Sequence, residues 1–333
     1  MSSMIKIAVD AMGGDNSPKK VIDGIILHHL SNSNVIYKIF GDEKKINNFI
    51  NNKIKKSSYE IINTTNKVSS EDSPLEAAKR GKDTSMWLAV ESVKNKDCDI
   101  VISAGNTGAL LVISKLNLKM IENIDKPALS ALWPNKKGMS VVLDLGANIE
   151  CSSKNLFDFS IMGASLYKSL YPNETPKVAL LNIGSEELKG NETIKETYKI
   201  INEKKSEDYI FAGYIEGNEL MKGQVNVIVS DGFTGNVALK TAEGTANFIT
   251  EELKKALQGS FIGKFSSLLN ISNLKKFKKR LDPRLYNGAI FIGLDSPVVK
   301  SHGGTDYIGF ANSLDVCCKI INGNLIEKIK KNI

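Results

Sequence analysis

The stretch "CDIVISAGNTGALLVISKL" covers residues 98–116 and decides the fold class expected for this chain. It places a small polar string, Ser103 to Gly108, between two apolar runs. A short apolar run that is followed by Gly, Asn and Thr, and then by a second apolar run, predicts a buried strand that turns sharply into a helix. Backbone amides at such a turn are free to bind a ligand, so the string is a candidate site.

The same order of strand and helix recurs along the chain. Apolar runs bounded by Gly, Asn or Asp predict strands at residues 5–10, 99–105, 139–148, 177–184 and 225–232, with helical patterns at 18–30, 108–116, 155–170, 188–202 and 235–257. These runs lack alternation, which is typical of strands covered on both faces. We therefore expect an α/β fold of three layers, αβα, around a largely parallel, doubly wound sheet. Residues 1–333 form one catalytic domain in this prediction, with room for two lobes.

The composition is that of an ordinary globular protein. Of 333 residues, 42% are hydrophobic, and no window of 18 uncharged apolar residues occurs. The opening "MSSMIKIAVD" lacks the apolar region of a secretory signal, so a cytoplasmic location is expected. The four cysteines show no CxxC spacing and there are three histidines, so neither a metal site nor a disulfide framework is expected.

Polar, glycine-bearing strings follow all five predicted strands. They are "DAMGGDNSP", "SAGNTG", "DLGAN", "NIGSEELKGN" and "SDGFTGN". In doubly wound sheets, ligands bind outside the carboxyl ends of the strands, so we expect the five loops to meet at one sheet edge and form the site. For any single loop, the alternative is that its glycine serves only a tight turn.

Common catalytic fingerprints are missing. The chain contains neither GxGxxG nor GxSxG, and "GSFIGKF" at residues 259–265 is one residue short of a P-loop. No Ser-His-Asp or Cys-His arrangement suggests itself either. We therefore expect an enzyme that forms no covalent intermediate.

Seven motifs in a fixed order resemble those of the bacterial phosphate acyltransferase family, which makes acyl phosphates for phospholipid synthesis. They are "IAVDAMGGD", "VISAGNTGALL", "KPALSALWP", "LDLGAN", "LLNIGSEELKGN", "VSDGFTGNVALKTAEG" and "GAIFIGLDSPVVKSHGG", from about residue 5 to 315. The last two are also similar to the closing motifs of phosphotransacetylases, a group that shares its fold with isocitrate and isopropylmalate dehydrogenases. One departure is Asn16, where family members often carry His.

The resemblance implies a reaction and its partners. A fatty acyl group passes from the thioester of acyl carrier protein to inorganic phosphate, without metal or organic cofactor, and the acyl phosphate feeds phosphatidic acid synthesis. It also implies a homodimer that associates peripherally with the membrane and with the membrane glycerol-3-phosphate acyltransferase. Nucleic acid is not an expected partner, because aromatic residues do not interleave the basic ones and no reader fold is recognisable.

Phosphate is a ready nucleophile, so the protein has mainly to place it and to stabilise the oxyanion. Asn106, Thr107 and Gly108 are predicted to cradle phosphate or the oxyanion. The residues predicted to be catalytic are Asp231, Asn106, Asn236 and His302, and those predicted to bind substrate or phosphate are Asp10, Gly13, Gly14, Asp15, Thr107, Gly108, Asn148, Lys189 and Asn191.

Several of these assignments have a structural alternative. Asp15 can cap a helix or form a turn. The phosphotransacetylase resemblance places Asp231 near the thiol, where it orients donors or handles the proton of the leaving thiolate. Lys189 supplies the positive charge that phosphate requires, or is a solvated lysine at a helix start. His302 is catalytic, or packs its loop.

The net charge of +7 belongs to one segment. Eight basic residues and no acidic one lie between Lys254 and Arg280, and the remainder carries −1. Apolar residues from 253 to 281 recur in steps of three and four, which predicts an amphipathic helix interrupted at Gly259 and Gly263. The predicted membrane or partner surface comprises Phe261, Phe265, Leu268, Lys275 and Lys276. Anionic lipid, a second subunit and the acidic acyl carrier protein remain alternative occupants.

Two other functions compete with this prediction. A dehydrogenase of the related fold is disfavoured, because the chain lacks an Arg-rich carboxylate site and an obvious aspartate cluster for a metal. Another thioester–phosphate acyltransferase stays open. A non-catalytic membrane adaptor would account for residues 253–281, but not for the five polar loops.

Overall fold

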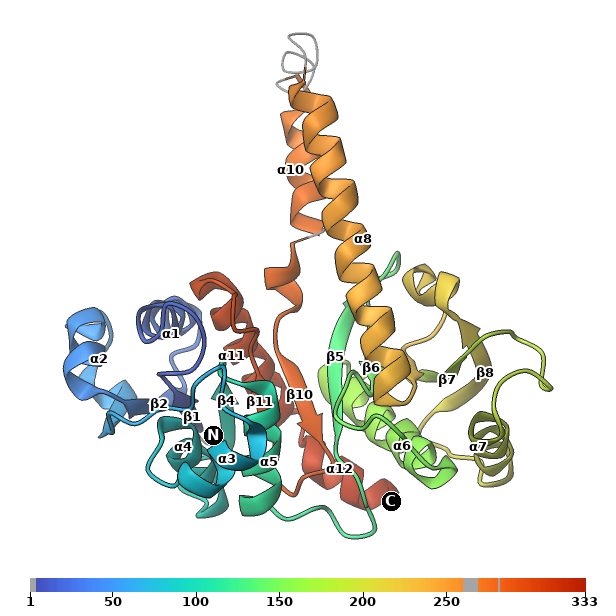
Figure 1. Ribbon diagram of the computed structural model, residues 1–333, viewed down its shortest axis with the longest axis horizontal. Coiled ribbons are helices and arrows are strands. Elements are labelled where there is room, and N and C mark those ends of the chain that lie inside the picture. The colour runs from blue at the N-terminus through green and yellow to red at the C-terminus, as the bar shows by residue number, and fades with distance from the viewer. Residues whose placement is uncertain (1–3, 260–268, 281) are drawn as a thin grey trace.

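The computed structural model describes residues 4–259, 269–280 and 282–333. One mixed sheet forms its centre, with helices on both sides, and one long and one shorter helix stand out from the body (Figure 1). The sheet has 11 strands in the order β3-β2-β1-β4-β11-β10-β5-β6-β9-β7-β8. This agrees with the α/β class expected from the sequence.

The strands are β1 (Ile5–Asp10), β2 (Val35–Gly41), β3 (Tyr59–Asn63), β4 (Ile100–Ser103), β5 (Ala128–Pro134), β6 (Met139–Leu143), β7 (Lys177–Asn182), β8 (Ile210–Glu216), β9 (Val227–Val229), β10 (Ala289–Ile292) and β11 (Val298–Lys300). All five predicted strands are present, at β1, β4, β6, β7 and β9.

The helices are α1 (Lys19–Ser31), α2 (Glu43–Ile50), η1 (Lys56–Ser58), α3 (Pro74–Arg80), α4 (Ser85–Lys94), α5 (Thr107–Asn117), α6 (Ser153–Leu170), α7 (Glu192–Glu203), η2 (Gly217–Lys222), α8 (Gly232–Gln258), α10 (Ile271–Arg280), η3 (Pro283–Tyr286), α11 (Tyr307–Asn322) and α12 (Leu325–Asn332). The five predicted helices correspond to α1, α5, α6, α7 and α8.

Alternate residues of β1 enter two different cores. Ile7 and Val9 belong to a core that also contains residues of α1, α6 and α11. Ala8 belongs to a second core with residues of α4 and α5. Because successive side chains of a strand point to opposite faces, both faces of the sheet are covered. The three-layer arrangement explains why the buried strands show no polar alternation.

The sheet changes direction at a hairpin. β1, β2, β3, β4 and β11 are parallel. β10 is antiparallel to both β11 and β5, so β5 runs in the direction of β1. β6 is antiparallel to β5, and β9, β7 and β8 follow the direction of β6. Residues 135–138 join β5 to β6 in a tight turn, closed by a hydrogen bond of 3.0 Å from Asn135 N to Gly138 O. A hairpin reverses the chain, whereas a crossover helix keeps neighbouring strands parallel.

This reversal makes one prediction wrong. The loops after β1 and β4 lie at one edge of the sheet, and the loops after β6, β7 and β9 lie at the opposite edge. The five polar loops therefore form two groups and do not meet at a single edge.

The basic segment forms part of a helical hairpin. The first turns of α8 pack on the body through Ala238, Leu239 and Ala242. From Glu243 to Glu252 every residue of α8 is exposed, and α10 stands out from the body with it (Figure 1). α8 ends at Gln258 with Gly259 as its C-cap. This agrees with the helix interruption predicted at Gly259.

The predicted surface residues of this segment are only partly described. Lys275 and Lys276 lie exposed on α10. Phe261, Phe265 and Leu268, like the second predicted interruption at Gly263, lie outside the described residues.

Candidate functional site

Three loops come into contact at the carboxyl ends of β1, β4 and β11. A Cβ atom on Gly13 would lie 2.6 Å from the Gly105 nitrogen, and one on Gly14, whose φ is +81°, would lie 2.7 Å from the Ala104 oxygen. The Asp15 amide donates to the Gly303 carbonyl at 3.0 Å. Glycine allows this approach because a side chain would separate the loops. We call residues 10–18, 103–108 and 300–306 the three-loop site.

A buried carboxylate lies beneath these loops. Asp10 is 1% exposed and accepts hydrogen bonds from the Ser85 and Ser103 hydroxyls, each at 2.6 Å. Burial raises the pKa of Asp10, and the bonds from Ser103 and Ser85 oppose that rise. Asp10 thus links β1, β4 and α4 below the surface, so its place favours a positioning role over contact with substrate.

Two lysines are buried in the same site. Lys20 is 5% exposed and Lys300 is 7% exposed. The Lys20 ammonium donates to the Gly303 carbonyl, and the Lys300 ammonium donates to the Ser301 carbonyl. Burial, together with the positive charge of Lys20, lowers the pKa of Lys300 to about 8. Two buried ammonium groups are thus bound to carbonyls of the same loop, that of residues 300–306.

The imidazole of His302 is a neutral hydrogen-bond donor. Its Nδ1 accepts the Gly304 amide hydrogen at 3.2 Å, so the ring proton of the neutral form lies on Nε2. Burial lowers the pKa of His302, and the charge of Lys300 lowers it further, whereas Glu243 opposes this.

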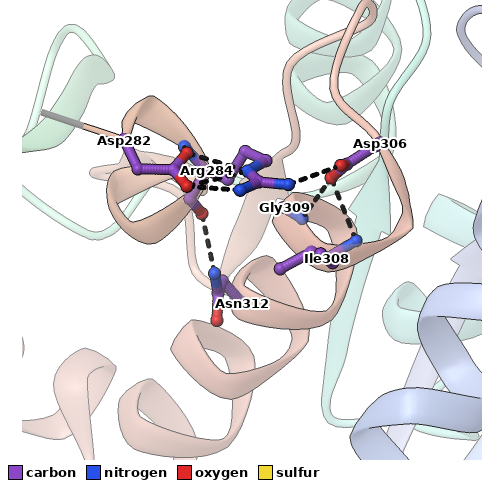
Figure 2. A network of polar contacts seen from close by, with 6 residues as sticks. All are labelled: Asp282, Arg284, Asp306, Ile308, Gly309 and Asn312. Atoms are coloured by element: carbon purple, nitrogen blue, oxygen red, sulfur yellow. Dashed lines mark hydrogen bonds and ion pairs between the residues drawn. The ribbon is translucent and has the colours of Figure 1, made fainter. Parts of the chain in front are cut away.

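A polar network holds the His302 loop in place (Figure 2). Asp306 accepts from Arg284 Nη1 at 2.9 Å and caps α11 through the amides of Ile308 and Gly309. The Arg284 Nε donates to Asp282 at 2.8 Å. The segment that follows α10 is therefore fastened directly to the start of α11.

Asn287 adds a second link to the His302 loop. Its Oδ1 accepts the His302 amide hydrogen at 2.9 Å, and its Nδ2 donates to the Ser301 hydroxyl at 2.9 Å and to the Gly309 carbonyl at 3.0 Å. One carboxamide thus joins the His302 amide and the Ser301 hydroxyl to the first turn of α11.

The opening polar string lies at the start of α5. Asn106 is its N-cap, and the Asn106 Oδ1 accepts the Ala109 amide at 3.1 Å. Its Nδ2 donates to the carbonyls of Asp72 at 3.0 Å and Ser70 at 3.3 Å. The Asn106 side chain is therefore engaged within the protein. The amides of Thr107 and Gly108, in the first turn of α5, have no intrahelical acceptor and face the ligand edge of the sheet.

A second group of predicted residues gathers at the opposite edge around Asp144. This fully buried carboxylate accepts five hydrogen bonds: from the amides of Leu129, Gly146, Ala147 and Asn148 and from the Asn148 carboxamide. Asn148 also donates to the Pro127 carbonyl at 2.7 Å, and Asn236 donates to the Leu145 carbonyl at 3.0 Å. Both amide hydrogens of Asn148 are thus used internally.

The other three predicted residues cap helices or lie exposed beside them. Asp231 is the N-cap of α8 and accepts the amide and the hydroxyl of Thr234, at 2.8 and 2.9 Å. Asn191 is the N-cap of α7. Lys189 is exposed in the loop after β7. These residues lie at the edge opposite the three-loop site, so Lys189 and the loops after β1 and β4 are not brought together.

Comparison with known proteins decides the family. A family model described as "Fatty acid synthesis protein" matches residues 5–328. The "Phosphate acyltransferase" of Pelagibacter ubique is 77% identical over 333 residues, which cover 100% of both chains. The chain belongs to the phosphate acyltransferase family of fatty acid synthesis. It is accordingly an acyltransferase enzyme.

Solved structures of other acyltransferases and of a dehydrogenase share its fold. A phosphotransacetylase from Streptococcus pyogenes matches with a TM-score of 0.64 at 16% identity, covering 98% of this chain and 95% of that one. A 4-hydroxythreonine-4-phosphate dehydrogenase from Klebsiella pneumoniae matches with a TM-score of 0.50 at 11% identity, covering 97% and 100%. The fold expected from the sequence is thereby confirmed.

Four residues that shape the two groups of loops were not predicted from the sequence: Lys20, Lys300, Asp144 and Asn287. Two of them carried a sequence signal. Lys300 interrupts the apolar run "SPVVKSHGG", and Lys20 shares the stripe of α1 that also buries Gly24 and His28. A lysine on an apolar stripe indicates a buried charge that needs a reason.

No helix in the described part of the chain is both long and apolar enough to cross a membrane.

Proposed function

We propose that this phosphate acyltransferase takes its acyl group from the thioester of acyl carrier protein and transfers it to inorganic phosphate at the three-loop site. The observation that carries the proposal is the gathering of a neutral imidazole and buried cations where three glycine-rich loops meet. Anionic ligands bind at such strand ends, where amides and helix N-termini point outward.

The chemistry needs placement more than activation. A phosphate oxygen attacks the thioester carbonyl carbon, the carbonyl oxygen becomes an oxyanion, and the carbon–sulfur bond then breaks to release the thiolate. A donor aimed at the oxyanion lowers this barrier because it acts where charge develops. The Nε2 hydrogen of His302 and the free amides of Thr107 and Gly108 are the donors that support this role.

The test is direct. Purified full-length protein is incubated with palmitoyl acyl carrier protein and phosphate, and hydroxylamine traps acyl phosphate as the hydroxamate. The expected result is hydroxamate that depends on both phosphate and enzyme. Replacing the carrier with coenzyme A tests the donor, and a preference for coenzyme A would refute the carrier as donor. No hydroxamate with either thioester would refute the reaction.

We also propose that the α8–α10 hairpin brings the enzyme to its partners. Exposed apolar residues on it include Phe248, Ile249 and Phe277, at 66, 51 and 42% exposure, beside the exposed Lys275 and Lys276. Lysines around apolar residues suit an anionic membrane surface. Such a location would deliver acyl phosphate to the membrane glycerol-3-phosphate acyltransferase for phosphatidic acid synthesis, from a cytoplasmic homodimer.

A further inference from the structure

We propose that Lys20 and Lys300 together bind the inorganic phosphate that accepts the acyl group. This inference rests on the proposed function and names the residues that hold its nucleophile. Neither lysine belonged to the set predicted from the sequence, in which Lys189 supplied the positive charge.

The two ammonium groups are buried without a matching carboxylate. Each is more than nine-tenths buried, and neither has a carboxylate oxygen within 4.0 Å among the residues that the structure describes. Burying a charge without a partner costs several kcal/mol, so proteins rarely keep one without a use. Two such charges in one site are the arrangement that an anionic ligand would stabilise.

Each lysine also has donors to spare. An ammonium has three N–H bonds, and Lys20 and Lys300 each donate to one carbonyl, those of Gly303 and Ser301. The remaining hydrogens are available to ligand oxygens. Both carbonyls belong to the loop that carries His302, whose pKa is lowered by both lysine charges. Both ammonium groups are therefore held by the loop that carries the imidazole.

Gly14 lets the first loop pack closely against Lys20. A Cβ on Gly14 would lie 2.9 Å from Lys20 Nζ and 3.1 Å from the Gly303 oxygen. A side chain at position 14 would therefore collide with the lysine and the loop that it binds. The carboxylates of Asp10 and Asp15 oppose the lowered pKa values of Lys300 and Lys20 from beyond ion-pair distance, so neither takes the place of a directly bound anion.

A dianion is a better match for two cations than a monoanion. Inorganic phosphate is mostly dianionic at pH 8, whereas the phosphodiester of phosphopantetheine carries one charge. Both ligands would present phosphate oxygens to the lysines: inorganic phosphate as a free ion, and phosphopantetheine as part of the carrier. Charge matching favours the free phosphate, and the experiment below separates the two.

The first experiment measures inorganic phosphate binding to the full-length protein by isothermal titration calorimetry. Lys20→Met and Lys300→Met should each weaken binding about 10- to 100-fold, because each removes a charge-assisted hydrogen bond. Lys19→Met is the matched control, since Lys19 is solvent-exposed and pairs with Asp23. It should leave the dissociation constant unchanged. Unchanged phosphate binding in both test variants would refute the proposal.

The second experiment uses the unmodified enzyme, so it does not depend on how a variant folds. At pH 8 about half of Lys300 is uncharged in the free protein, and bound phosphate should restore its proton. The calorimetric enthalpy should therefore differ between buffers of different ionisation enthalpy, in proportion to the protons taken up. Lys300→Met should abolish that uptake. No proton uptake by the unmodified enzyme at any pH from about 7 to 10 would also refute the proposal.

The same titrations separate the ligands and the two hypotheses. If holo-acyl carrier protein, which carries the phosphodiester, binds with the lysine dependence and inorganic phosphate does not, the lysines serve the carrier and the proposal fails. If hydroxamate forms in the acyl-transfer assay while phosphate binding ignores both lysines, only this inference fails. If phosphate binds through the lysines but no acyl phosphate forms, the proposed reaction fails and the phosphate site stands.

Discussion

At the residue scale, protonation states decide what the three-loop site can do. His302 accepts a hydrogen bond at Nδ1 and lies near Lys20 and Lys300, so its environment favours the neutral ring. A neutral imidazole polarises a carbonyl by donating a hydrogen bond, and it does so without moving a charge. The two lysines provide the charge instead.

The donor role of His302 predicts a difference between two variants. Glutamine keeps an N–H group near the position of Nε2, so His302→Gln should retain most of the rate of acyl phosphate formation. His302→Ala should lose about 100-fold in kcat, as is typical when one oxyanion donor is removed. Rates are compared by the hydroxamate assay. An equal loss in both variants would instead indicate that His302 transfers a proton.

Lys300 makes the stability of the protein depend on pH in a defined window. Its pKa falls from 10.5 in the unfolded chain to about 8 in the folded one, so its charge opposes folding below pH 8. That cost disappears as pH rises from about 8 to 10.5. Lys300→Met should therefore raise the free energy of unfolding at pH 7 by about 3 kcal/mol. Urea titrations should show the difference shrinking toward pH 10, and a constant difference would contradict this account.

At the element scale, helix starts use many of the polar residues that the sequence places after strands. Asn106, Asn191 and Asp231 are the N-caps of α5, α7 and α8. Asp306 caps α11 and also binds Arg284, so one helix start joins the hairpin base to the three-loop site. A polar residue that follows a strand can therefore be the N-cap of the next helix, and need not bind a ligand.

Asp231 can be tested for its two alternative roles. Asn at this position keeps an acceptor for the Thr234 amide but removes the charge. If Asp231 acts as a cap, Asp231→Asn should leave kcat and melting temperature nearly unchanged, and Asp231→Ala should lose about 1 kcal/mol of stability. The geometry favours this outcome. A large drop in kcat for Asp231→Asn at unchanged melting temperature would assign the carboxylate to proton transfer.

At the scale of the whole molecule, the positive charge is separated from the catalytic body. The hairpin of α8 and α10 stands out from the sheet and carries the basic residues (Figure 1). The segment after α10 is bound to the His302 loop through Arg284 and Asn287. The segment that follows the hairpin is therefore bonded directly to the loop that carries His302.

Membrane attachment through the hairpin predicts a charge-dependent flotation. The protein should float with vesicles that contain anionic lipid and not with neutral ones. Each basic residue contributes about 1 kcal/mol near an anionic surface, so Lys275→Glu with Lys276→Glu should lower partitioning by about 30-fold or more. Replacing the exposed Lys53 and Lys55 by Glu is the matched control. Flotation that is absent from the start would favour a subunit interface or carrier docking.

The sequence by itself determined the class of fold, five strands, five helices and the family. These features depend on neighbouring residues, because buried strands and capped helices leave local patterns of apolar runs and polar stops. β5 and β10 escaped prediction although both lie within quoted motifs, since a short apolar run does not reveal whether it forms a strand or with which strand it pairs. Lys300 lies in the quoted motif "VVKSHGG", but the motif does not show that its side chain is buried.

Only the tertiary structure decided which loops share an edge. The hairpin of residues 135–138 reverses the second half of the sheet and separates Asp231, Asn148 and Lys189 from Gly14 and His302. Strand direction depends on pairings between distant segments, and burial depends on which elements pack together. A sequence pattern contains neither. Lys20 and Lys300 are 280 positions apart, so only the folded chain shows that both donate to carbonyls of one loop.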